Sequence, residues 1–186
     1  MPQGNWIETY TGRKFYPIDP DPDDINIEDI AHALSLICRF NGHCRFFYSV
    51  AQHSLGVQEE LAREGYSKVY QLYGLLHDAA EAYLADVISP VKPHLVNYED
   101  LEKRLLANIF KKFGLLPLSG RIWAYRTPLK YFDAVMLNAE ARALMCNTDN
   151  WAGRLPRIER NIIFEDPGAV EQRFLMRFRG LREMVE

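Results

Sequence analysis

The chain of 186 residues is poor in cysteine and has no long apolar run. Its three cysteines, Cys38, Cys44 and Cys146, are odd in number and form no Cys-x-x-Cys pair. This excludes a disulfide framework and a zinc ribbon and is typical of a reducing compartment. No apolar stretch approaches the roughly 18 residues that a membrane-spanning helix needs, and residues 1–6 lack the pattern of a signal peptide. We therefore expect a cytoplasmic protein with no membrane partner.

The sequence also lacks an excess of positive charge. It has 22 lysines and arginines against 25 aspartates and glutamates, a formal net charge of -3. A domain that wraps duplex nucleic acid usually carries a clear basic excess, so we expect no extended nucleic-acid binding. A small anionic ligand remains open, because it needs only a local cation or a metal. The 48% of apolar residues is ordinary for a globular protein, and the length suits one domain.

Helical periodicity fills most of the chain and predicts an all-α fold. Residues 6–16 surround Thr11-Gly12 and predict a short hairpin, and the prolines of residues 17–24 predict a loop. We therefore divide the chain into an N-terminal hairpin and loop segment, residues 1–25, and one helical bundle, residues 26–186. Pro128 suits the first turn of the helix predicted near residues 128–143. The apolar spacing predicts helices near 27–38, 50–65, 69–80, 101–113, 128–143 and 170–181.

Histidines and carboxylates that could bind a metal occur on three of these helices. His53 lies in the second, and His77-Asp78 lies near the end of the third, with Glu81 one helical turn after His77. Asp133 lies among apolar residues of the fifth helix, where a buried carboxylate would need a partner. Imidazoles and carboxylates from several helices are the ligands of a divalent metal site between helices.

Each of these residues also has an ordinary structural interpretation. A single histidine on a helix is more often a hydrogen-bonded core or surface residue, and an aspartate in a helix usually faces solvent. The hypothesis depends on the combination of His53, the pair His77-Asp78, Glu81 four residues after His77, and Asp133 on a further helix. Two histidines and two aspartates suit Zn, Co, Mn, Ni or Fe, so the sequence predicts one divalent ion without naming it.

The same residues resemble the H…HD…D signature of HD-domain phosphohydrolases. The resemblance runs from about residue 26 to residue 145 and includes four stretches. They are Cys38-Arg39-Phe40, the segment 48–54 around His53, the segment 77–81 with His77, Asp78 and Glu81, and the segment 86–92 from Asp86 to Lys92. They are similar to compact dATP triphosphohydrolases and to 5′-deoxynucleotidases, and the resemblance implies an HD-type helical bundle.

The resemblance implies a role for each matching residue. His53, His77, Asp78 and Asp133 would hold the metal, and Glu81 would be the catalytic carboxylate that orients or deprotonates water. Arg39 and Lys92 would bind substrate phosphate. Alternatively, Arg39 ends a helix, Lys92 is an exposed loop residue, Phe40 packs internally and Asp86 caps a turn. Three residues would contact sugar or base: Phe40, which replaces a tryptophan of relatives, Asp86 and Pro90.

The activity implied is metal-dependent hydrolysis of a deoxynucleotide. We expect a dNTP triphosphohydrolase of the dATP type that releases deoxynucleoside and triphosphate, with additional Mg or Mn bound to the triphosphate. A 5′-deoxynucleotidase acting on dNMPs is the alternative within this class, and hydrolysis of another phosphoester is a further one. A non-catalytic nucleotide-binding helical module is the alternative from another class. The resemblance also implies a homo-oligomer.

Overall fold

The computed structural model describes residues 4–115 and 122–184, with side chains from residue 128 onward in the second range. The N-terminal hairpin is confirmed: β1 (Ile7–Glu8) pairs antiparallel with β2 (Lys14–Phe15). Thr11 at the turn donates to the buried Asp29 carboxylate from its backbone N–H, at 2.7 Å, and from its hydroxyl, at 3.0 Å. Phe15 is fully buried in the main core, so the hairpin is part of the packed fold.

The all-α fold is confirmed, and polar caps begin several helices. Asn26 caps the first helix, Ser67 caps the third, and Ser49 forms a capping box with Gln52 at the second. Short 3₁₀ turns are η1 (Pro22–Asp24), η2 (Arg39–Gly42), η3 (Lys92–His94) and η4 (Ala152–Arg154). The helices are α1 (Ile27–Leu36), α2 (Val50–Arg63), α3 (Lys68–Leu76), α4 (Glu81–Leu84), α5 (Tyr98–Lys112), α6 (Ile122–Leu144) and α7 (Pro167–Arg182).

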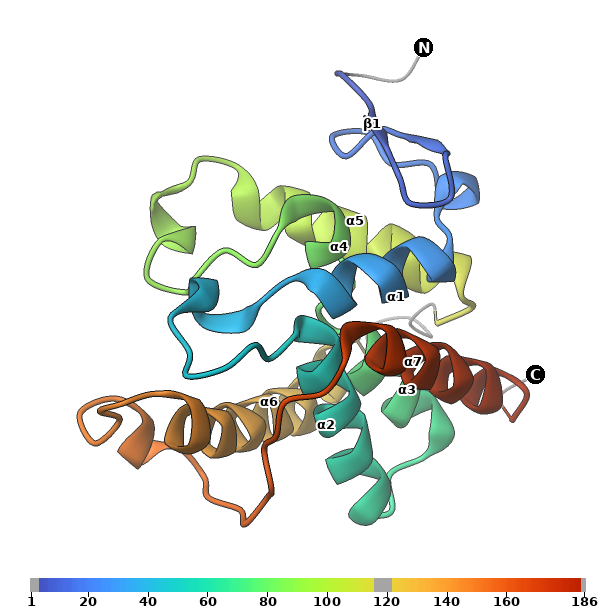
Figure 1. Cartoon of the computed structure of the whole chain (residues 1–186). Coiled ribbons are helices and arrows are strands. Elements are labelled where there is room, and N and C mark those ends of the chain that lie inside the picture. Colours follow the sequence, from blue (N-terminus) through green and yellow to red (C-terminus); the bar gives the residue numbers. More distant parts are fainter. Residues whose placement is uncertain (1–3, 116–121, 185–186) are drawn as a thin grey trace.

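Helix α2 is the centre of the bundle. It contacts α1, α3, α6 and α7 (Figure 1), and most of its residues are buried. One apolar cluster joins α1, α3, α5 and α7, and a second joins α2 to α6. A polar side chain on α2 is therefore surrounded by protein. No helix within the described ranges is long and apolar enough to cross a bilayer.

Two predicted helix boundaries are wrong. The third helix ends at Leu76, because residues 77–80 form tight turns in which Ala79 N–H bonds Leu76 and Glu81 N–H bonds Asp78. The fifth helix begins at Ile122, so Pro128 lies inside it and not in its first turn. At this position proline removes one backbone hydrogen bond of the helix.

The close contact of α2 with α3 predicts that a side chain at Gly74 will not fit. A Cβ there would lie 2.4 Å from Cδ1 of the buried Leu61 and 3.5 Å from Cα of Gln58. We expect Gly74→Ala to lower the free energy of unfolding by about 1–3 kcal/mol, measured by urea denaturation. Gly180→Ala in α7 is the control: it meets nothing within 4 Å and should raise that free energy by about 0.4–1 kcal/mol. Equal effects would contradict this packing.

Candidate metal centre

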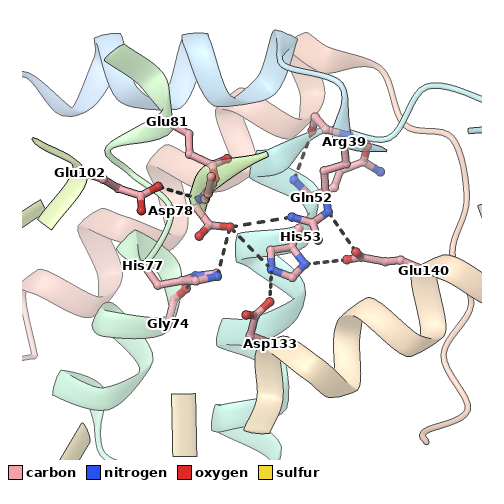
Figure 2. A network of polar contacts seen from close by, with 12 residues as sticks. Arg39, Gln52, His53, Gly74, His77, Asp78, Glu81, Glu102, Asp133 and Glu140 are labelled. Carbon is pink, nitrogen blue, oxygen red and sulfur yellow. Dashed lines mark hydrogen bonds and ion pairs between the residues drawn. The ribbon is translucent and has the colours of Figure 1, made fainter. Parts of the chain in front are cut away.

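His53 on α2 is fully buried, and its two ring nitrogens face different groups. Nδ1 lies 2.8 Å from Oε1 of Glu140. Nε2 lies 3.1 Å from Oδ1 of Asp133 and 3.7 Å from Oδ2 of Asp78 (Figure 2). The central helix thus places one imidazole where carboxylates from α6 and from the 77–80 turn meet.

His77, the residue that follows α3, has the same division of roles. Its Nδ1 lies 2.8 Å from the Gly74 carbonyl oxygen, which can only accept, so Nδ1 carries a proton and, in the neutral ring, Nε2 carries the lone pair. Nε2 lies 3.2 Å from Oδ2 of Asp78. Neither histidine Nε2 makes a hydrogen bond of regular geometry within the described residues. An Nδ1 that donates to a carbonyl or carboxylate while Nε2 stays available is the usual arrangement of metal-ligating histidines.

These nitrogens and the neighbouring carboxylates form a group that could hold a metal ion. Ligand atoms of His53, His77 and Asp133 all lie within 4.8 Å of one another. Asp78 Oδ2 adds a second carboxylate beside both imidazoles. The structure therefore brings the four predicted ligands together, and two imidazoles with two carboxylates match the chemistry of a divalent transition metal.

The pKa values of the group reflect the pairing of its imidazoles with carboxylates. Burial and the charge of Arg39 lower the pKa of His53, but Glu140 and Asp133 outweigh them and raise it to about 10. Burial raises the pKa of Asp78, but His77, His53 and Arg39 overcome this and hold it well below its usual range. The imidazoles and carboxylates therefore stabilise each other's charged forms.

Glu81, the first residue of α4, borders this group. His77, Asp78, Glu81 and Lys92 line one cavity of about 170 Å³. The Glu81 side chain is buried, and its Oε2 has no hydrogen-bond partner among the described residues. Burial, followed by the charges of Asp78 and Asp86, raises the pKa of Glu81 to about 10, against the lowering effect of Arg39 and Lys92.

The two predicted phosphate-binding residues lie at the site, and each already has carboxylate partners. Arg39 Nε lies 3.0 Å from Oε2 of Glu140, and its Nη1 lies 3.8 Å from Oδ2 of Asp78. Lys92 Nζ lies 2.7 Å from Oε1 of Glu102 and 3.8 Å from Oε1 of Glu81. Arg39 follows the end of α1, and Lys92 is half-buried. Phosphate binding by these two residues stays a prediction.

The three residues predicted to contact sugar or base differ in their burial. Asp86 is half-buried, and burial raises the pKa of its carboxyl group. The Arg39 guanidinium carbon lies 5.6 Å from the centre of the Phe40 ring, and this ring makes an edge contact with Trp151. Pro90 is exposed. Contact of these three residues with a nucleoside stays a prediction.

Glu140 is a residue that the sequence analysis missed. It is fully buried and contacts both His53 and Arg39. Its sequence signal is its spacing: it follows Asp133 by seven residues, which places both carboxylates on the same face of α6.

Comparison with known proteins shows relatives of the same length. No known family profile matches the chain. It is 37% identical over 184 residues to the uncharacterized protein YfdR of Escherichia coli strain K12, a match that covers 97% of each chain. It is 44% identical over 115 residues to an uncharacterized protein of Rhodobacter capsulatus, which covers 59% of each. Neither name states an activity.

The metal site can be tested by comparing two histidines. His77→Gln removes an Nε2 of the group, so we expect Co²⁺ affinity to fall by more than the roughly 10–100-fold that loss of an outer hydrogen bond costs. His94→Gln is the matched control, because His94 is exposed in η3 and lies outside the group. Titration of Co²⁺ followed by its visible absorption measures both. The ligand assignment is wrong if the two variants bind Co²⁺ equally well.

Proposed function

The chain belongs to the family of the Escherichia coli protein YfdR, and for this chain we propose metal-dependent hydrolysis of a deoxynucleotide phosphoester. One observation carries the proposal. The Nε2 atoms of His53 and His77 meet two carboxylates beside a further buried carboxyl group, Glu81, whose Oε2 has no hydrogen-bond partner among the described residues. A metal ligand set next to a candidate base is what hydrolysis by an activated water needs. The resemblance to HD-domain phosphohydrolases supplies the substrate class.

His53, His77, Asp78 and Asp133 would hold the metal in this proposal. When bound, a divalent cation would polarise the phosphoryl group, acidify water and compensate the negative charge that raises the pKa of Glu81. Glu81 would then accept a proton from the attacking water at Oε2. Its burial keeps the carboxylate in one place and bulk water away from it.

Arg39 and Lys92 would neutralise charge on the phosphate oxygens. Arg39 can keep Glu140 on Nε while its terminal nitrogens, one of them 3.8 Å from Asp78, meet the phosphate. Lys92 would share its ammonium group between Glu102 and the substrate. The hydrolysed bond would be the one between the α-phosphorus and the 5′ oxygen for either substrate below.

Hydrolysis of a dNTP to deoxynucleoside and triphosphate is the first candidate, from the resemblance. A second candidate, 5′-deoxynucleotidase activity on dNMPs, is favoured by the charges at the cavity. Arg39, Lys92 and Lys103 are each already ion-paired, the last with Glu99 at 2.9 Å. A triphosphate would therefore need its own Mg²⁺ or Mn²⁺, whereas a monophosphate would not. A non-catalytic nucleotide-binding module has no use for Glu81, and we place it last.

Two further parts of the proposal concern the setting of the enzyme. Cytoplasmic location is supported by the free thiols of Cys38 and Cys44, whose sulfurs lie 3.5 Å apart and suit a reducing compartment. Assembly into a homo-oligomer is supported by the resemblance alone.

Glu81→Gln tests the proposed base. The amide keeps the shape of the side chain but cannot take a proton from water, so kcat should fall by about 10²–10⁴-fold. Co²⁺ affinity should stay near that of the wild type, because Glu81 lies outside the ligand group. Glu64→Gln, an exposed change at the end of α2, is the control for kcat. Wild-type turnover in Glu81→Gln would contradict the mechanism.

The substrate can be identified from the products. Metal-loaded protein is incubated with dNTPs, dNMPs and ribonucleotides, and the products are separated by ion exchange. Release of triphosphate, rising with added Mg²⁺, is the result expected for the first candidate. Orthophosphate from dNMPs alone, without a need for added Mg²⁺, supports the second. Binding without turnover of any substrate would overturn both in favour of the non-catalytic module.

A further inference from the structure

Glu140 connects two parts of the site that the proposed mechanism treats separately. Its Oε1 lies 2.8 Å from Nδ1 of His53, and its Oε2 lies 3.0 Å from Nε of Arg39 (Figure 2). One carboxylate therefore contacts a candidate metal ligand from α2 and a candidate phosphate-binding residue from η2. None of the three side chains is more than slightly exposed.

A fully buried carboxylate is costly unless its charge is used. An apolar side chain of similar volume would fill the same space on α6 without that cost. Glu140 is compensated here by a guanidinium and an imidazole N–H, each on a separate oxygen. Oε1 is therefore hydrogen-bonded to the imidazole, and Oε2 forms an ion pair with the guanidinium, without a hydrogen bond of regular geometry among the described residues.

Each contact restricts the orientation of its partner. The Nδ1–H of His53 donates to Glu140, so in the neutral ring the lone pair lies on Nε2, beside Asp78 and Asp133. The guanidinium of Arg39 is planar, so a contact to Nε limits the plane in which its terminal nitrogens lie. One of these, Nη1, faces Asp78 on the metal side.

We propose that Glu140 is a positioning residue that holds His53 and Arg39 in one arrangement and thereby couples metal binding to phosphate binding. The inference rests on the proposed function, because it assigns the metal to His53 and the phosphate to Arg39. Loss of the second acceptor oxygen of Glu140 should weaken both ligands, although Glu140 contacts neither.

Glu140→Gln is the test variant. A glutamine has one acceptor oxygen, so its NH₂ group faces either the His53 N–H or the Arg39 N–H, and one contact is lost. We expect Co²⁺ affinity to fall about 10–100-fold. We also expect inorganic phosphate to bind the Co²⁺-loaded protein about tenfold more weakly or worse. Glu140→Asp keeps both acceptor oxygens and the charge, and should restore part of each loss.

Glu60→Gln is the matched control. Glu60 is also a buried carboxylate, but its partners are Arg160 and Arg63, and it belongs to none of the groups at the metal site. It should lower the thermal unfolding temperature of the metal-free protein as Glu140→Gln does, and leave Co²⁺ and phosphate affinities within about twofold of the wild type. Equal losses of affinity in the two variants would show a structural role only and overturn the inference.

Coupling is measured with Arg39→Lys and the double variant. If Glu140 acts on phosphate through Arg39, the double variant should bind phosphate no more weakly than Arg39→Lys alone, whereas additive losses would overturn the coupling. The metal titration separates this inference from the proposed function. Failure of the wild type to bind Co²⁺, Mn²⁺ or Zn²⁺ refutes the proposed function. If the wild type binds metal and Glu140→Gln binds it equally well, only the role of Glu140 is refuted. If Glu140→Gln does not fold, Glu140→Asp takes its place in the test.

Discussion

The buried contact between His53 and Glu140 constrains how the central helix α2 meets α6. Neither side chain is exposed, so separating them would leave a polar group without compensation inside the bundle. The apolar packing agrees with this contact: Met136 lies between Asp133 and Glu140 along α6 and packs where Gly56 of α2 has no side chain. A Cβ at Gly56 would lie 2.4 Å from Met136 Cε. The absence of a side chain there lets α6 come close enough for its two carboxylates to reach the imidazole.

The segment between α1 and α2 supplies the third partner of this contact. Arg39 N–H donates to the Tyr48 carbonyl, and Val50 N–H donates to Ile37, so both ends of the segment are held against each other. Between them Phe40 has a φ of 55°, a conformation that a bulky residue adopts only where the surroundings impose it. This strained turn directs Arg39 toward Glu140, and the ion pair compensates the charge that α6 buries. Backbone geometry and electrostatics therefore fix the same guanidinium.

The parts of the fold and site that sequence predicts are those with local signals. The hairpin at Thr11 follows from spacing and residue type, whereas the meeting of His53, His77 and Asp133 from separate elements is expected from the combination of ligands and from the family resemblance. The end of α3 at Leu76 has no such signal, because residues 77–80 keep apolar spacing while their backbone forms tight turns. Glu140 has only its spacing from Asp133 and looks like an ordinary helix glutamate until α2 and η2 are placed around it. Long-range pairing of charges is set by tertiary structure, which a helical pattern does not contain.

Positive and negative side chains are paired with each other at this site, in keeping with the small net charge of the chain. Lys92 is shared between Glu102 and Glu81, and Arg39 between Glu140 and Asp78. Both of these cationic side chains are therefore already paired with carboxylates of the protein, which leaves little uncompensated positive charge for an anion. The carboxylates would instead bind a divalent cation together with the two histidine nitrogens. In the proposed function, a bound metal would therefore supply the positive charge for a phosphate that the paired Arg39 and Lys92 do not offer.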